Sequence, residues 1–140
     1  MKLMRGCLLL LLAGAITLIA AEPKTATIEG KLVIHAGAPA ALETASGEHI
    51  ELDGDTPTRK VLHDTRIDGM QAQATGHYTG PGKFLVDPQY KRALLVRKDG
   101  KLKMITYWCE VCGIRSYTPG PCVCCQGETE VDLRDPEDIR

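Results

Sequence analysis

The chain has 140 residues, enough for one domain of ordinary size with short additional segments. Its 17 basic and 18 acidic side chains give a formal net charge of −1. Nucleic-acid binding normally needs a concentration of basic residues, so this balance argues against a nucleic-acid partner. We expect the partner to be another protein or a small ligand.

Residues 1–21 have the order of charged, apolar and small residues that is typical of a secretory signal peptide. Lys2 and Arg5 precede an apolar run from Cys7 to Ala20, which is shorter than the roughly 20 residues of a membrane-spanning helix. We predict a cleaved signal and an exported, periplasmic or extracellular protein without a stable membrane span. An uncleaved membrane anchor is the alternative.

Alternation of apolar and polar residues, together with short apolar runs, predicts a series of β-strands. The predicted strands are residues 26–35, 48–52, 70–78, 83–86, 93–97 and 102–108. The last two flank Asp99-Gly100, which is a strong hairpin signal. Between the second and third predicted strands, Asp55 or Thr56 is placed to cap a short helix ahead of Pro57.

Small residues on the inward faces of these strands suit the tight curvature of a closed sheet; they are Gly30, Ala72, Ala74 and Gly76. We predict a mainly β protein with a small antiparallel barrel over residues 22–103. The number and order of strands from 26 to 97 resemble an OB-fold, particularly the small OB-like domains of exported bacterial proteins. The OB arrangement has its helix between strands three and four, whereas the predicted helix follows strand two. An SH3-like barrel is therefore the alternative.

Five of the six cysteines lie between residues 109 and 125. Disulfide scaffolds usually spread cysteines along the chain, so this clustering favours a local site. Cys109 and Cys112 form one Cys-x-x-Cys pair, and Cys122 and Cys125 form a second pair after nine intervening residues. Four thiolates at this spacing predict a tetrahedral zinc site, with Cys124 as an alternative ligand.

The first pair and the following Gly113 resemble the cysteine knuckle of rubredoxins and zinc ribbons. The resemblance implies a zinc-ribbon-like β-hairpin over residues 104–134, before an acidic flexible tail at 135–140. A strand at 128–133 would pair beside 104–108, and the metal would supply folding energy to a hairpin too short to bury a core. The second pair departs from the pattern, because its glycine, Gly127, comes one position late.

Other chemistry at the cysteines stays open. Export brings oxidising surroundings, so two disulfides with one free thiol are the main alternative. Cu(I), thiol redox chemistry and iron in a rubredoxin-like site are the others. Arg115, Lys101 and Lys103 lie near the cluster in sequence and could offset the charge of a zinc tetrathiolate, and Trp108 could shield the metal or fill a junction.

No stretch of the sequence has an enzyme's catalytic arrangement. His63-Asp64 could be part of one, but no Ser or Cys nucleophile with a supporting motif accompanies it. The leading hypothesis is a non-enzymatic exported binding or structural protein with a structural zinc site. The alternative is a periplasmic metal-handling (copper) or thiol-redox protein that uses the Cys109–Cys125 cluster.

Overall fold

The computed structural model describes residues 21–88 and 90–138, so the predicted signal peptide, apart from its last residue, lies outside the described residues. Their strands are β1 (Ala26–Val33), β2 (Ala41–Glu43), β3 (His49–Asp53), β4 (Gln71–Gly80), β5 (Lys83–Val86), β6 (Leu94–Lys98), β7 (Lys101–Cys109), β8 (Ile114–Ser116) and β9 (Glu130–Arg134). The helices are α1 (Thr56–Leu62), the 3-10 turn η1 (Thr65–Ile67) and α2 (Tyr90–Ala93). Within these residues, no helix is long and apolar enough to cross a membrane.

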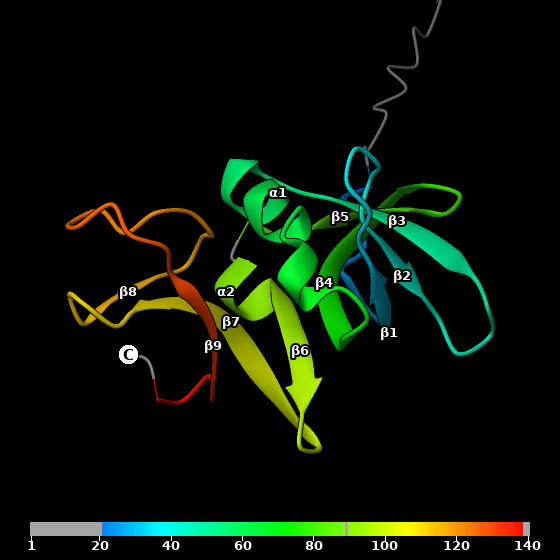
Figure 1. Cartoon of the computed structure of the whole chain (residues 1–140). Coiled ribbons are helices and arrows are strands. Elements are labelled where there is room, and N and C mark those ends of the chain that lie inside the picture. Colours follow the sequence, from blue (N-terminus) through cyan, green and yellow to red (C-terminus); the bar gives the residue numbers. More distant parts are fainter. Residues whose placement is uncertain (1–20, 89, 139–140) are drawn as a thin grey trace, which may run out of the picture.

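Five strands close into a barrel in the order β1-β2-β3-β5-β4, and β4 returns to pair with β1 (Figure 1). β3 and β5 run parallel, while the other neighbours in the barrel are antiparallel. The helix α1 lies between β3 and β4 in the chain. The mainly β, OB-like fold class predicted from the sequence is therefore confirmed.

The prediction missed β2, and this explains the apparent departure from the OB arrangement. β2 has three residues, too few to show an alternating pattern, and its pairing with β1 and β3 defines it. Once β2 is counted, the helix follows the third strand and precedes the fourth, as the OB arrangement requires.

The short helix forms where its capping residues predicted it. The Asp55 carboxylate caps α1 by accepting hydrogen bonds from the Thr58 N–H at 3.0 Å and the Thr58 hydroxyl at 2.6 Å. Pro57 occupies the first turn, where its missing N–H has no cost. The helix then buries Val61 and Leu62 in the barrel core.

Two of the inward-facing glycines are needed because strands approach one another closely. A Cβ at Gly30 would lie 2.5 Å from the carbonyl oxygen of Glu43, and one at Gly76 would overlap the carbonyl oxygen of Leu85. Ala72 and Ala74 on the same barrel wall are also buried. The small residues thus permit the curvature that the sequence predicted.

The long strand β7 connects the barrel with the cysteine segment, residues 109–129 (Figure 1). Its first half pairs with β6 across a turn in which Asp99 and Gly100 have φ angles of 52° and 76°, as the predicted hairpin requires. Its last residues pair with β8, while β9 pairs along Met104–Trp108. The predicted pairing of the last strand with residues 104–108 is therefore present.

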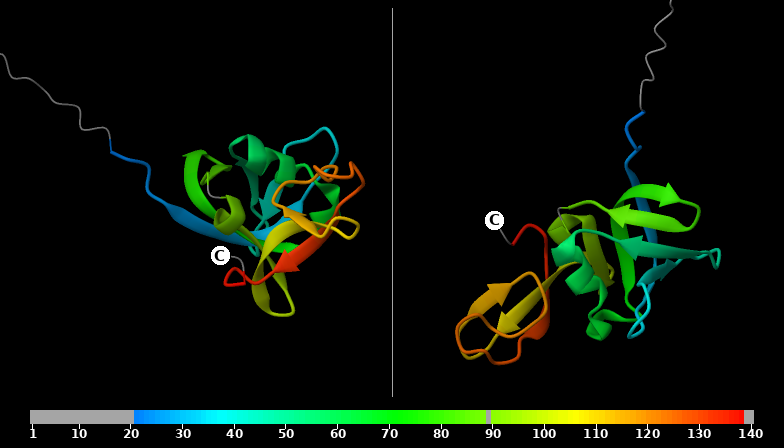
Figure 2. Two further views of the ribbon diagram at one scale, coloured as in Figure 1. Left: turned by 90° about the vertical axis from the view of Figure 1, so that its left-hand side faces the viewer. Right: turned by 90° about the horizontal axis from the view of Figure 1, so that it is seen from above.

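The cysteine segment projects from the barrel (Figure 2), but its supporting strands share the barrel core. Ile105 and Tyr107 of β7 are buried in the same apolar cluster as the barrel residues, and Val131 and Leu133 of β9 pack against it. The expectation of a hairpin too short to bury a core is therefore wrong. The predicted boundary between residues 103 and 104 falls inside β7, and the division into two domains stays a prediction.

Candidate metal centre

The first cysteine pair lies in a tight turn between β7 and β8, residues 109–113, which we call the first knuckle. Cys109 is the last residue of β7 and stands opposite Ile114 in the sheet. The Gly113 N–H donates to the Cys109 carbonyl at 2.8 Å, and Gly113 has a φ of 63°. This left-handed backbone conformation explains the glycine of the Cys-x-x-Cys-Gly pattern.

The second pair lies in the loop between β8 and β9 and repeats this turn at residues 122–126, the second knuckle. The Gln126 N–H donates to the Cys122 carbonyl at 3.0 Å, and Gln126 has a φ of 59°. Gln126 therefore occupies the left-handed position that Gly113 takes in the first knuckle. Gly127 has another role: its carbonyl accepts the Cys122 N–H at 2.8 Å.

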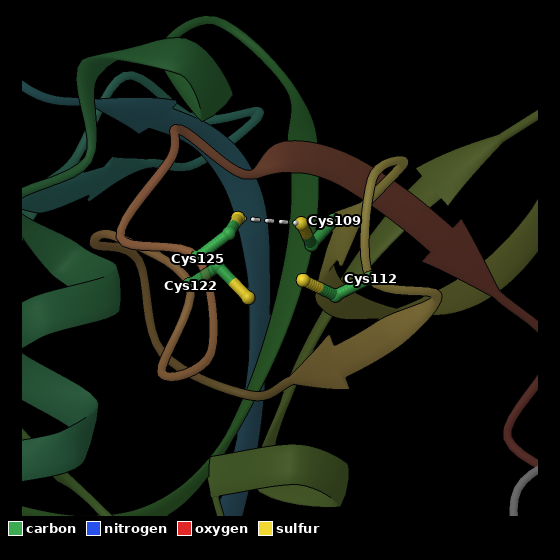
Figure 3. Close-up of side chains that lie close together, drawn as sticks. All are labelled: Cys109, Cys112, Cys122 and Cys125. Atoms are coloured by element: carbon green, nitrogen blue, oxygen red, sulfur yellow. Dashed lines mark hydrogen bonds between the residues drawn. The ribbon is translucent and has the colours of Figure 1, made fainter.

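The two knuckles bring together the four cysteines that the spacing singled out. The sulfurs of Cys109, Cys112, Cys122 and Cys125 all lie within 4.8 Å of one another, and Figure 3 shows them facing a common centre. The Cys109 and Cys125 sulfurs are 3.6 Å apart. Cys109 and Cys122 are buried, whereas Cys125 is exposed, so one side of the cluster faces solvent.

Backbone N–H groups of the second knuckle point at its two sulfurs, and those near Cys122 favour its ionisation. The N–H groups of Cys125 and Cys124 lower the pKa of the Cys122 thiol to about 7, and the Cys124 N–H lies 3.4 Å from the Cys122 sulfur. The Gly127 N–H donates to the Cys125 sulfur at 3.4 Å. Such bonds stabilise thiolates, which are the form that binds metals.

The thiols of Cys109 and Cys112 are harder to ionise in the metal-free protein. The Cys112 N–H lowers the pKa of Cys109, but burial and the thiols of Cys122 and Cys125 together raise it by more. The thiols of Cys124 and Cys125, with burial, raise the pKa of Cys112 well above its ordinary value. Crowded thiols resist ionisation together because each thiolate repels the next, and a cation would relieve that repulsion.

Cys124, the alternative ligand, lies outside the group of four. Its side chain is exposed, and its contribution to the second knuckle is the backbone N–H that reaches Cys122. Its thiol is still close enough to Cys112 to raise the pKa of that residue.

Two of the three cations singled out in the sequence, Arg115 and Lys103, form ion pairs with carboxylates. Arg115 donates to Asp132 at 2.5 Å, with its guanidinium carbon 5.0 Å from the centre of the Trp108 ring. Lys103 donates to Asp135 at 2.7 Å. Trp108 thus packs between Arg115 and the first knuckle, where a methyl group on Gly113 would meet its ring at 3.8 Å.

One important contact could not be predicted from the sequence. Arg66, next to the barrel, donates a hydrogen bond to the carbonyl of Thr129, beside the second knuckle and 63 positions later in the chain. No local pattern links two such distant residues. The left-handed position of Gln126, in contrast, could have been found in the sequence, because Gln126 follows Cys125 as Gly113 follows Cys112.

No family model, curated protein or solved structure matches the chain. Within residues 21–88 and 90–138, the four cysteines are the group found able to hold a metal ion. The proposed function therefore rests on the donor chemistry of this group.

Proposed function

We propose that the protein is an exported, non-enzymatic binding or structural protein whose cysteines Cys109, Cys112, Cys122 and Cys125 hold a structural zinc ion. The observation that carries the proposal is the convergence of four sulfurs from two knuckles of the same backbone shape. Zinc bound to sulfur at about 2.3 Å places the sulfurs of a regular tetrahedron about 3.8 Å apart. The 3.6 Å between the Cys109 and Cys125 sulfurs and the 4.8 Å limit for the group fit this requirement.

A structural role for the metal follows from the number of ligands. Four protein thiolates fill the tetrahedral coordination of zinc and leave no position for water or substrate, unlike the three-ligand sites of zinc enzymes. The bound ion would neutralise part of the thiolate charge and hold the two knuckles together. This supports a binding or structural role over an enzymatic one.

Analysis of the mature protein, purified without chelator, tests whether the site holds zinc. We expect one zinc per chain by elemental analysis, with four thiols protected from a thiol reagent until a chelator is added. Absence of metal together with oxidised cysteines would refute the zinc site and favour two disulfides. Iron instead of zinc would indicate a rubredoxin-like site.

Two serine variants test the ligand set. Cys124→Ser should keep the metal, because the Cys124 side chain lies outside the group of four. Cys109→Ser should lose the metal and loosen the cysteine segment. Loss of metal in both variants would show that Cys124 belongs to the ligand set.

A copper-handling or thiol-redox function is the second candidate, and Cys124 is the observation that favours it. A fifth, exposed thiol beside Cys112 is surplus to a structural zinc site. Soft thiolates also select Cu(I). Preference for copper over zinc in a competition measurement would favour this candidate and refute the structural zinc site.

Export is supported by the signal-like order of residues 1–21. Expression of the whole gene, cell fractionation and amino-terminal sequencing test it. We expect an exported mature chain that begins near Glu22. A protein retained in the cytoplasm with its first residues intact would refute export.

The barrel is the proposed binding part, and a cavity of about 560 Å³ beside α1 supports a small-molecule partner. Leu52 and Leu62 give it an apolar surface, while His35, Arg59 and His63 supply polar groups. This size and mixture of residues are typical of ligand pockets. A ligand bound there should shift the imidazole NMR signals of His35 and His63, and ligands that shift neither signal would refute this location.

A further inference from the structure

The structure holds the two cysteine pairs in place by different means. The first pair follows directly from the pairing of β7 with β8, so the sheet positions Cys109 and Cys112. The second pair lies in the 120–129 loop, which contains no strand. The position of Cys122 and Cys125 relative to the first pair therefore depends on the contacts that hold the base of this loop.

Thr129 closes the base of the 120–129 loop. Its hydroxyl donates to the Gly120 carbonyl at 2.8 Å, and the residue is 5 % exposed. Its own carbonyl accepts a hydrogen bond from Nη1 of Arg66 at 2.7 Å. Arg66 belongs to η1, which lies between the barrel elements α1 and β4, so this bond ties the loop to the barrel.

The Arg66 guanidinium is itself fixed before it reaches the loop. Its Nε and Nη2 each donate to Asp64 at 2.9 Å, in a two-pronged pairing with a carboxylate whose side chain is 6 % exposed. The guanidinium carbon of Arg66 lies 5.3 Å from the centre of the buried Tyr107 ring. A carboxylate and an aromatic ring therefore hold the group that contacts Thr129.

We propose that Arg66 is a positioning residue for the metal centre: anchored by Asp64 and Tyr107, it fixes the 120–129 loop so that Cys122 and Cys125 face the first pair before a metal arrives. This inference rests on the proposed function and deepens it. The contacts described for Arg66 are with Asp64, Tyr107 and Thr129, not with the sulfurs, so it acts through the loop.

Preorganisation predicts a specific effect on metal affinity. If Arg66 orders the second pair in the metal-free protein, its removal makes the metal supply that ordering, and affinity falls. Residues that orient metal ligands without touching the metal typically change affinity by about 10–100-fold. The shape of the Arg66 group matters as well as its charge, because lysine cannot reach a carboxylate and a carbonyl in the same fork geometry.

The variants are Arg66→Met, which removes the contacts, and Arg66→Lys, which keeps the charge. Arg97→Met is the matched control: Arg97 also pairs with a carboxylate, that of Glu29 at 3.6 Å, and donates to a backbone carbonyl, that of Gly100 at 3.3 Å. Zinc affinity is measured by competition with a chromogenic chelator. We expect a fall of about 10–100-fold for both Arg66 variants and less than twofold for Arg97→Met.

The double variant Asp64→Asn/Arg66→Met distinguishes a positioning role of Arg66 from a purely structural one. Removing Arg66 alone leaves the buried Asp64 charge without its partner and destabilises the fold, and the second substitution removes that charge. We expect the double variant to recover thermal stability but not zinc affinity. Recovery of both, or unchanged affinity in folded Arg66→Met, would overturn the proposal.

A measurement without metal separates this inference from the zinc proposal. Amide hydrogen exchange in the metal-free full-length protein should be faster across residues 120–129 in Arg66→Met than in the wild type or Arg97→Met. Equal exchange would overturn the positioning role even if zinc binds. Absence of zinc from the wild type, with faster loop exchange in Arg66→Met, would refute the zinc site and leave the role of Arg66 in ordering the loop supported.

Discussion

The two knuckles offer a matched test of backbone strain. Gly113 and Gln126 occupy equivalent positions with φ angles of 63° and 59°, but one is glycine and the other carries a side chain. The left-handed conformation costs a residue with a Cβ about 1–2 kcal/mol. Gln126→Gly should therefore stabilise the protein, and Gly113→Ala should destabilise it.

The magnitudes follow from the local contacts. Gln126→Gly also removes a hydrogen bond from Nε2 to the Val123 carbonyl, which is long at 3.4 Å and exposed, and it adds flexibility to the unfolded chain. We expect a net gain of about 1 kcal/mol after these losses. At Gly113 an added methyl group meets Trp108 at an ordinary contact distance of 3.8 Å, so the expected loss of about 1 kcal/mol comes from the backbone alone.

The assay is thermal unfolding at one fixed concentration of free zinc, because metal binding changes the apparent stability. For a chain of this size, 1 kcal/mol corresponds to a shift of about 4 °C in the midpoint. We expect about +4 °C for Gln126→Gly and −4 °C for Gly113→Ala. Shifts of the same sign, or no shift in either variant, would refute the equivalence of the two knuckles.

Three further predictions concern the barrel and the titrating groups. Gly76→Ala should lower the free energy of unfolding, measured by urea denaturation, by about 3 kcal/mol, because the added Cβ would overlap a carbonyl oxygen. Gly80→Ala is the control and should change the free energy little, because open space surrounds that position. Equal effects of the two substitutions would refute the close approach at Gly76. Burial raises the pKa of Asp64, but the hydrogen bonds and charge of Arg66, with a hydrogen bond from Tyr107, together hold it below its ordinary value. The pair therefore stabilises the fold above about pH 4, and this contribution is lost on acidification. Asp64→Asn should therefore flatten the acid side of the stability curve, and an unchanged slope would contradict this assignment. In the metal-free protein, thiolate absorbance should show a first ionisation at a pKa of about 7 that Cys122→Ser lacks; persistence of this step would place it on another thiol.

The barrel could be predicted where a strand is long enough to show its own alternation. The alternating pattern from Met70 to Tyr78 predicted the strand that the structure has at Gln71–Gly80, and the Asp99-Gly100 turn identified the β6–β7 hairpin. β2 escaped because three residues carry no periodicity, and tertiary pairing with its neighbours decides its conformation. Because this strand was missed, the predicted number of strands before the helix was too small by one, and the agreement with the OB arrangement was hidden.

The candidate site could be predicted because the spacing within each cysteine pair is a local property. A Cys-x-x-Cys turn places two sulfurs together wherever it occurs, and the structure brings both pairs into one group. The position of Cys124 outside the group depends on the turn that residues 122–126 adopt, which the spacing alone does not define. The bond from Arg66 to Thr129 joins distant segments and becomes visible only once the chain is folded.

The alternating side-chain directions along β7 link the barrel core to the cysteine cluster, so an insertion or deletion in this strand would affect both. Ile105, Tyr107 and Cys109 occupy every second position of β7, so they point to the same face of the strand, and all three are buried. A shift of the strand register by one residue would turn the two core side chains and the cysteine away together. A single-residue insertion early in β7 would thus disturb the barrel core and the cysteine cluster at once, so both constrain the length of this strand.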